Sequence, residues 1–278
     1  MITIGMIVLN EAEYLGKNLA QHYGWADVII LIEGADRRYP DGNVSVTGLS
    51  TDSTAEIVRS FPDPWQKIRF IQHGWAADKC ELRNRYLELA GEGMLAVLDA
   101  DEFYTNKSQS LISSCVTSAA ANGIRSFAIP QVHIWQPPGA AWSLGCRFIR
   151  GSYADVPHNR FYWWRPSEGA RYVSNHNEPE LPSGEPLSSL GRVCAPLKFN
   201  KPDPAVFVAQ EPCCVHFGFA KHSRNVRDKT DYYLARGEAQ TRPETSRFRA
   251  GWFDGNLPPE CRVEMYGGPW PECFGGAA

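Results

Sequence analysis

The chain has 278 residues, of which 43% are hydrophobic, and its formal net charge is −3. This length and apolar content permit a full core in one large domain or two modest ones, and the small negative charge argues against a globally basic nucleic-acid-binding protein. No segment approaches the roughly 18 consecutive apolar residues of a membrane helix, and the N-terminus lacks the cationic start of a signal peptide, so we expect a soluble cytoplasmic protein.

Short apolar runs alternate with helical segments in the first part of the chain. The apolar runs lie at 3–9, 28–33, 67–72, 94–99 and 124–130. The helical segments between them lie at 11–23, 52–61, 77–90 and 107–121. Runs undiluted by polar residues are typical of strands that are buried on both faces. The alternation therefore predicts an α/β fold, in which a mostly parallel sheet carries helices on both faces.

The sequence changes character after about residue 130, where aromatic residues and Pro become frequent. We expect an irregular, aromatic-rich C-terminal part. Within it, apolar stretches at 205–209 and 213–219 predict strands, and 221–236 predicts a polar helix that Gly237 closes.

A cluster of carboxylates follows the apolar run at 94–99, since Asp99, Asp101 and Glu102 come directly after it. Ligands of open α/β sheets bind beyond the carboxyl ends of the strands, where this cluster falls. The two-residue period of a strand puts Asp99 and Asp101 on the same side, so they can share one hard divalent cation or divide a metal and a ribose between them. Alternatively, one Asp caps the next helix and the others face water.

Several nucleotide-binding and metal-binding motifs are missing. The first apolar run continues as IVLNEAEYL, without the G-x-G-x-x-G of a dinucleotide site, and the chain has neither a P-loop nor the Gly-rich basic loop of a sugar nucleotidyltransferase. The eight cysteines include no Cys-x-x-Cys pair, which argues against a zinc ribbon or a thioredoxin-like site.

Four motifs in order, MIVLNEAEYLGKNL, STDSTAEIV, KCELRNRYLELA and VLDADEF, resemble the N-terminal half of the family 2 glycosyltransferases with the GT-A fold. The resemblance covers residues 1–125 and implies a Rossmann-like nucleotide-diphospho-sugar transferase. Residues 1–130 would form the donor-binding half, and 131–278 the acceptor-binding half and C-terminal extension of the same domain. In one departure, Glu33 matches the acidic residue of the family after the second strand, but the insertion 34–49 then precedes STDST.

This resemblance implies a metal-dependent, inverting hexosyltransferase-like enzyme with a nucleotide-sugar donor, in the first instance a UDP-sugar. The departing diphosphate needs positive charge, which a metal ion supplies. The resemblance implies that Mn²⁺ or Mg²⁺ binds to Asp101, Asp99 and His216. It implies donor contacts from Asn10, Glu11, Glu33, Asp52, Lys79, Arg83 and Asp99. Lys221, in the basic cluster that follows His216, suits phosphate and is a further expected donor contact. On the alternative interpretation, Lys79 and Arg83 are a solvated pair and His216 is a hydrogen-bonded core residue.

A second segment, from 158 to 179, is similar to the Arg-Phe-Arg and His-Glu part of the family. Arg160 matches the first Arg and His176 the His, but Asn177 separates His176 from Glu178. A carboxylate or an imidazole can take the proton of the acceptor hydroxyl. Glu178 is our first candidate for this catalytic base and His176 the second, although both could merely order a loop.

The acceptor is left open between a polysaccharide, another glycan and a nucleic acid, because we see no integral membrane segment. Residues 192–249 hold 11 Lys and Arg against 6 Asp and Glu, which permits an acceptor such as a hydroxylated DNA base. An alternative of another class is a non-catalytic module that keeps the GT-A fold and binds a carbohydrate or a partner, and the interrupted His-Asn-Glu segment motivates it.

Overall fold

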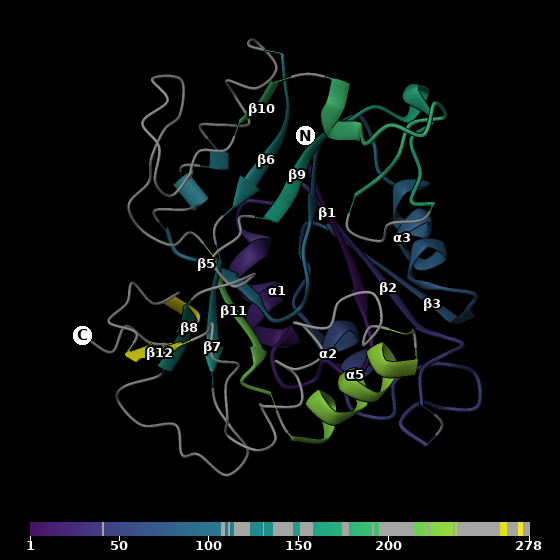
Figure 1. The fold of residues 1–278 in the computed structure, drawn as a ribbon, viewed down its shortest axis with the longest axis vertical. Helices are drawn as coiled ribbons and strands as arrows, with labels where there is room; N and C mark the ends of the chain where they lie inside the picture. The colour runs from purple at the N-terminus through teal and green to yellow at the C-terminus, as the bar shows by residue number, and fades with distance from the viewer. Residues whose placement is uncertain are drawn as a thin grey trace.

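The computed structural model of the chain contains two sheets and several helices (Figure 1). It describes residues 1–40, 42–106, 109–110, 112–113, 123–129, 131–135, 147–150, 158–173, 178–190, 192–194, 214–221, 223–235, 237, 262–265 and 272–274. The helices are α1 (Leu15–Tyr23), α2 (Thr54–Ser60), α3 (Lys79–Leu87) and α5 (Ser223–Ala235), with short 3-10 turns at Pro166–Glu168, Leu187–Leu190 and Glu272–Phe274.

The larger sheet has seven strands and is mostly parallel. In spatial order these are β10 (Arg192–Cys194), β6 (Ile124–Ile129), β9 (His158–Trp164), β4 (Gly93–Val97), β1 (Ile2–Val8), β2 (Val28–Asp36) and β3 (Ile68–Ala76). Four neighbouring pairs, β3–β2, β2–β1, β1–β4 and β6–β10, are parallel. Only β9 runs against its neighbours β4 and β6. The prediction of a mostly parallel α/β sheet is confirmed, whereas β9 was not foreseen.

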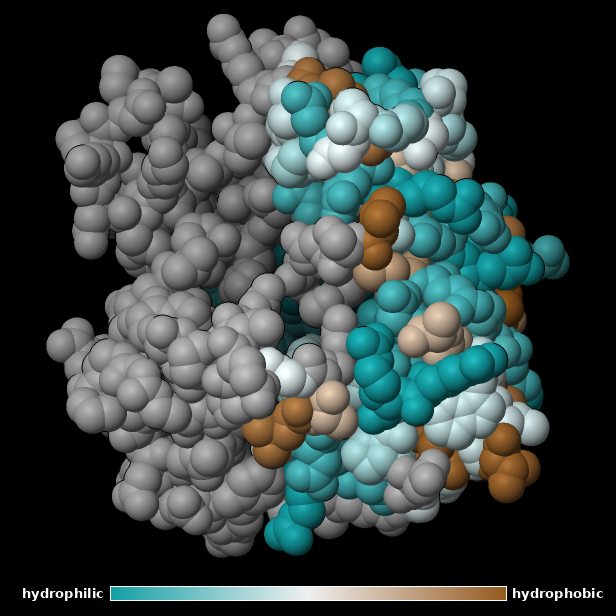
Figure 2. All heavy atoms as spheres, turned by 45° about the vertical axis from the view of Figure 1, so that its right-hand side comes forward, coloured by the Kyte–Doolittle hydropathy of each residue, from teal (hydrophilic) through white to brown (hydrophobic). Residues whose placement is uncertain are grey.

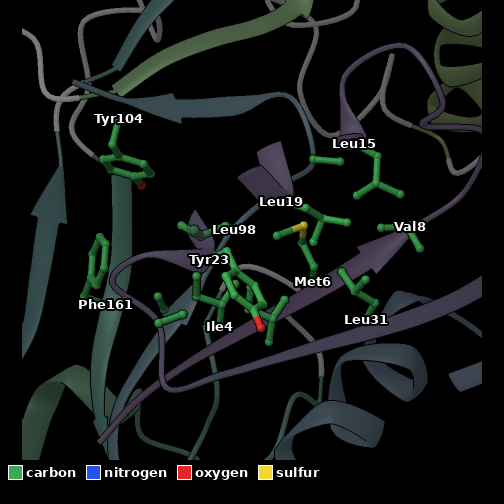
Figure 3. Packing of buried hydrophobic residues seen from close by; sticks show 14 of the residues in the cluster. Ile4, Met6, Val8, Leu15, Leu19, Tyr23, Leu31, Leu98, Tyr104 and Phe161 are labelled. Carbon is green, nitrogen blue, oxygen red and sulfur yellow. The ribbon is translucent and has the colours of Figure 1, made fainter. Parts of the chain in front are cut away.

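Helices cover both faces of this sheet because its strands are apolar on both sides. Alternate residues of β1, such as Ile4 and Met6, pack with Leu15 and Leu19 of α1 (Figure 3). The opposite face of the sheet packs against α3, where the ring of Tyr86 is fully buried. Gly5 of β1 lies under that ring, since a Cβ atom built on Gly5 would stand 2.6 Å from Cδ2 of Tyr86.

The smaller sheet has five strands and is joined to the larger one through the carboxylate cluster. In spatial order these are β12 (Arg262–Met265), β8 (Arg147–Arg150), β7 (Gln131–Trp135), β11 (Cys214–Phe219) and β5 (Glu102–Tyr104). The chain leaves β4 in the larger sheet and enters β5 in the smaller one after four residues, 98–101. In this crossing segment, the carbonyl of Asp101 accepts a hydrogen bond of 2.9 Å from the backbone N–H of Phe217.

Two of the three elements predicted in the C-terminal part of the chain fall mostly within the described residues. The strand predicted at 213–219 is confirmed as β11, and the helix predicted at 221–236 is confirmed as α5, followed by Gly237 with a φ of 76°. The strand predicted at 205–209 lies outside the described residues, as does most of the helix predicted at 107–121.

Asn43, in the insertion 34–49, contacts both Asn10 and α5. The side-chain amide of Asn43 donates to Asp228 on α5, at 2.5 Å, and its carbonyl accepts from the side chain of Asn10 at 2.6 Å. At the start of the insertion, Glu33 accepts a hydrogen bond of 3.0 Å from the backbone N–H of Ser50. Asn43 therefore links the loop after β1 to α5.

Hydrophilic side chains dominate the described part of the face shown in Figure 2, and the hydrophobic ones are scattered singly among them. Among the residues the structure describes, no helix has both the length and the apolar character needed to cross a membrane.

Candidate functional site

A cavity opens at the carboxyl ends of the parallel strands β1, β2 and β4, the edge at which ligands of α/β sheets bind. It is lined by Ile7, Val8, Leu9, Asn10, Glu11, Gly34, Asp36, Tyr39, Lys79, Leu82, Arg83, Asp99, Asp101, Arg160, Lys221, Lys229, Tyr232 and Tyr233. Seven residues expected from the sequence are among them: Asn10, Glu11, Lys79, Arg83, Asp99, Asp101 and Lys221. Carboxylates and cationic groups share this cavity, so its electrostatics follow from how they pair.

Asp101 is paired with Lys221. Its Oδ2 atom lies 2.8 Å from Nζ of Lys221, and its Oδ1 atom lies 3.5 Å from Nε2 of His216. Burial alone would raise the pKa of Asp101, but Lys221 and His216 outweigh it and hold the pKa well below its usual value. Burial alone would likewise lower the pKa of Lys221, but Asp101 and Glu11 raise it. Both side chains are therefore charged at neutral pH.

Asp99 and Glu102 are paired with two guanidinium groups. Nη2 of Arg160 lies 3.3 Å from Oδ2 of Asp99 and also contacts the carboxylate of Glu102, which is fully buried. On the other side, Nη2 of Arg83 lies 3.6 Å from Oδ1 of Asp99. Burial alone would raise the pKa of Asp99, but Arg160 and Arg83 outweigh it and lower the pKa. The negative charges of the cluster are thus neutralised by cations of the chain itself.

Helix α3 supplies Arg83 because its N-terminus points to the cavity. Asp78 accepts a hydrogen bond of 3.0 Å from the backbone N–H of Glu81 and so caps the helix. One turn further, Nη1 of Arg83 donates to the hydroxyl of Tyr86 at 3.1 Å. The guanidinium is nearly fully buried and is fixed in place, so the alternative of a solvated surface pair is wrong for Arg83.

One wall of the cavity is aromatic and was missed by the sequence analysis. Tyr232 and Tyr233 of α5 line it together with Tyr39 of the insertion. The hydroxyl of Tyr232 donates to Asp36 at 2.8 Å, and Nζ of Lys79 donates to the hydroxyl of Tyr233 at 3.1 Å. The spacing of Lys229, Tyr232 and Tyr233 on a predicted helix indicates one shared face, which is the signal that could have grouped them.

Two expected donor contacts, Glu33 and Asp52, do not line the described cavity. Glu33 accepts hydrogen bonds from the backbone N–H of Ser50 and from the side chain of Gln72, at 3.0 and 2.8 Å. Asp52 accepts from the backbone N–H groups of Thr54 and Ala12, both at 3.0 Å. In this arrangement the two carboxylates hold the loops that shape the cavity and do not face into it.

The two base candidates differ in what the structure says of them. His176 lies outside the described residues. Glu178 is described but does not line the cavity, and its Oε1 atom accepts a hydrogen bond of 3.0 Å from the backbone N–H of Ser188. Burial, and after it the charge of Glu178, raises the pKa of Tyr162 on β9. Glu178 therefore lies near the strand that carries Arg160.

The donor atoms around Asp101 do not fit a resident divalent cation. Of the three expected ligands, Asp99 faces two guanidinium groups. His216 turns Nε2 toward Oδ1 of Asp101 at 3.5 Å, and its Nδ1 lies 2.7 Å from Nδ1 of His133. A cation bound to Oδ2 of Asp101 would also lie within a few Å of the ammonium group of Lys221, which repels it. Within the described part of the chain, no three His, Cys, Asp or Glu side chains form a group that could hold a metal ion.

No protein-family model matches the chain, and no curated protein matches it. Solved structures to which it is similar include S. aureus TarS 1-349, at 8% identity and a TM-score of 0.44, with 91% of this chain and 70% of that chain covered. The same protein in complex with UDP-GlcNAc matches at 13% identity and a TM-score of 0.37, with 51% of this chain and 36% of that chain covered. The mannosyltransferase PcManGT from Pyrobaculum calidifontis in complex with GDP-Man and Mn2+ matches at 16% identity and a TM-score of 0.37. The match covers 50% of this chain and 36% of that chain. The chain thus covers about a third of the length of most of these proteins. TM-scores of 0.37 to 0.44 indicate a distant structural similarity and say nothing of activity.

Proposed function

We propose that the chain is a glycosyltransferase that moves a sugar from a nucleotide-sugar, in the first instance a UDP-sugar, to an acceptor hydroxyl. One observation carries the proposal: the cavity at the carboxyl edge of β1, β2 and β4 is lined by five Lys and Arg side chains and by three tyrosines. Cationic side chains suit a diphosphate, and tyrosine rings suit the stacking of a base. The four ordered motifs of the sequence support the same function.

The residues of the chain divide the work in this proposal. Lys79 and Arg83, at the start of α3, approach the departing diphosphate, because both carry positive charge and line the cavity. Arg160 holds Asp99 in place, and Asp99 then accepts a hydrogen bond from the ribose. The side chains of Lys79 and Arg83 supply the positive charge that the reaction requires.

The acceptor hydroxyl must lose a proton as it attacks the anomeric carbon from the face opposite the diphosphate, which inverts the configuration. We propose Glu178 as the base, with His176 second. A positioned carboxylate that accepts this proton contributes a factor of about 100 to 10,000 in rate. The acceptor is a polysaccharide, another glycan or a hydroxylated DNA base, and a DNA acceptor predicts binding that weakens steeply with salt.

Calorimetry with UDP tests the donor site. We expect UDP to bind about tenfold more tightly than uridine, because the diphosphate adds contacts to Lys79 and Arg83. Arg83→Met removes most of this advantage, whereas Arg85→Met, on the outer side of the same helix, leaves it unchanged. Equal affinities for UDP and uridine in the wild-type protein would rule out a diphosphate site.

A second candidate function, a binding module that retains the fold without catalysis, is favoured by the hydrogen bond that ties Glu178 to Ser188. Release of UDP from UDP-sugars separates the two. A glycosyltransferase hydrolyses the donor slowly without an acceptor, and Glu178→Gln lowers transfer by at least about 100-fold while UDP affinity is kept. Donor binding without any release of UDP, in wild type and variant alike, would support the binding module.

A further inference from the structure

The ammonium group of Lys221 lies between two carboxylates, where the sequence predicts a metal ion. Nζ of Lys221 is 2.8 and 2.6 Å from Oε1 and Oε2 of Glu11, and 2.8 Å from Oδ2 of Asp101. The side chains of Lys221 and Asp101 are only 5% and 2% exposed. A buried charge is stable only when it is paired, so the three groups form one unit, which we call the Lys221 bridge.

The backbone around Lys221 is held in place. The carbonyl of Ala220, the preceding residue, accepts a hydrogen bond from the hydroxyl of Tyr14, and the N–H of Ala220 donates to the carbonyl of Phe217 at 2.8 Å. Phe217 in turn donates its N–H to the carbonyl of Asp101 at 2.9 Å. Because these contacts lock the segment to the loop that carries Asp101, Lys221 does not behave as a mobile surface lysine.

Glu11 and Asp101 would repel each other without the ammonium group. Each comes from a loop at the carboxyl end of a parallel strand, and both approach the same nitrogen within 2.8 Å. Two carboxylates that converge on one point are the oxygen donors that Mn²⁺ and Mg²⁺ prefer. The bridge therefore satisfies the negative charge that would otherwise attract a divalent cation, and it does so with a group that cannot leave the chain.

We infer that Lys221 is the resident counter-cation of Glu11 and Asp101, and that it makes binding of the nucleoside diphosphate independent of divalent metal ions. This inference rests on the proposed function for the identity of the ligand. Removal of the ammonium group converts the same two carboxylates into a binding site for Mn²⁺. We expect this exchange at Lys221, which contacts both carboxylates, and not at Lys229. Lys229 lines the same cavity, but its charge acts on Glu11 and Asp101 less strongly than that of Lys221.

Two measurements test the inference, and one of them uses no nucleotide. Free Mn²⁺ is observed by electron paramagnetic resonance as protein is added, for wild type, Lys221→Gln, Lys221→Arg and Lys229→Gln. We expect the signal of free Mn²⁺ to fall only with Lys221→Gln, since only this change leaves both carboxylates without their cation. Lys229→Gln removes one positive charge from the same cavity and is the matched control, while Lys221→Arg keeps the charge in place.

The second measurement is calorimetry of UDP with EDTA or with Mn²⁺. We expect the wild-type affinity to agree within about twofold under the two conditions. For Lys221→Gln, we expect the affinity in EDTA to fall about tenfold and to recover in Mn²⁺. Lys229→Gln shows a loss that Mn²⁺ does not restore, because its carboxylate neighbours remain neutralised by Lys221.

Loss of the free Mn²⁺ signal with wild-type protein, or loss of wild-type UDP binding in EDTA, would overturn the inference. So would a folded Lys221→Gln variant that binds no Mn²⁺. Should Lys221→Gln fail to fold, the two wild-type arms still decide. If UDP binds under neither condition, the proposed function fails, whereas the Mn²⁺ titration of Lys221→Gln still decides whether the ammonium group excludes the cation.

Discussion

Arg160 stands out among single residues because one guanidinium group serves two carboxylates. It contacts Glu102, which is fully buried, and it lies 3.3 Å from Asp99. The removal of one partner from a buried ion pair costs more than the pair contributes, since a charge remains in the interior without compensation.

We expect Arg160→Met to lower the free energy of unfolding by about 3 to 5 kcal/mol at pH 7, measured by urea denaturation. Burial already raises the pKa of Glu102, and without Arg160 the pKa rises further. The folded variant then binds more protons than the unfolded chain, so its stability recovers as the pH falls toward 5. Arg160→Lys keeps the positive charge and is the control. A loss in Arg160→Met that does not change with pH would contradict this account.

His22 is a buried histidine that folds in its neutral form. Its Nδ1 atom accepts a hydrogen bond of 3.1 Å from the indole N–H of Trp25, so this nitrogen cannot carry a proton. Burial lowers the pKa of His22 from 6.5 to about 4. The unfolded chain binds a proton below pH 6.5 and the folded chain does not, so stability falls between pH 6.5 and 4.

We expect the neutral form of His22 to cost the fold about 3 kcal/mol of its free energy of unfolding as the pH falls from 6.5 to 4. We expect His22→Gln, which does not titrate, to be less stable than wild type at pH 7 but to lose less stability on acidification. Guanidinium denaturation at several pH values measures the difference between the two proteins. Parallel pH profiles would show that His22 is not the titrating group.

At the scale of elements, the seating of α3 on the sheet depends on Gly5 of β1. A Cβ atom at this position would stand 2.6 Å from Cδ2 of Tyr86. The hydroxyl of Tyr86 accepts a hydrogen bond from Arg83, so the packing of the helix also fixes a cationic group of the cavity.

We expect Gly5→Ala to destabilise the fold by about 1 to 3 kcal/mol, because the core is overpacked at Tyr86, and to weaken the binding of UDP as Arg83 moves. Gly16→Ala, in α1, is the matched control. Its new Cβ atom would lie 3.6 Å from Cγ2 of Ile57, an ordinary contact, and Ala favours the helix by up to about 1 kcal/mol. Thermal unfolding compares the two, and equal shifts would refute the role of Gly5.

Elements with strong periodic signals could be predicted from the sequence, and those defined by long-range pairing could not. The runs that became β1, β2 and β4 are apolar because both of their faces are covered. In contrast, β9 begins with three polar residues and ends with four aromatic ones, so it shows no strand period. Its place between β4 and β6 depends on partners distant in the chain. β5 is only three residues long, so no pattern could reveal it.

The candidate site was predictable in part for the same reason. Residues that follow a strand, such as Asp99 and Asp101, are located by the strand itself. The pairing of Asp101 with Lys221 joins positions far apart in sequence, and the resemblance assigned His216, in the run before Lys221, to a metal ion instead. Glu33 and Asp52 carry the residue types that the resemblance requires, but their hydrogen bonds to Ser50, Thr54 and Ala12 were not visible in the sequence.

At the scale of the whole molecule, the two sheets are tied together at several places. The hydroxyl of Tyr14, next to α1, donates to the carbonyl of Ala220 beyond β11, and its ring packs with Phe103 and Phe217 of the smaller sheet. The crossing segment 98–101 joins the sheets through the chain itself. Such shared packing favours cooperative unfolding.

We therefore expect one unfolding transition, with far-UV circular dichroism and tryptophan fluorescence giving the same midpoint in urea. Trp163 and Trp164 belong to the larger sheet and Trp135 to the smaller one, so fluorescence and circular dichroism both report on both sheets. Tyr14→Phe keeps the ring and removes the hydrogen bond to Ala220. It should lower the free energy of unfolding by about 1 kcal/mol, and so lower the urea midpoint, without separating the two curves. Two resolved midpoints in the wild-type protein would show that the sheets unfold independently.

The crossing segment 98–101 has a consequence for how ligand binding and internal order influence each other. Asp99 and Asp101 of this segment line the cavity together with Lys221, which follows the end of β11. A bound ligand would therefore contact residues connected to both sheets. If a bound ligand stabilises the smaller sheet by some factor, thermodynamic linkage requires that an ordered smaller sheet raises the affinity for the ligand by the same factor. A substitution deep in β11, remote from any bound molecule, would on this ground still alter the dissociation constant.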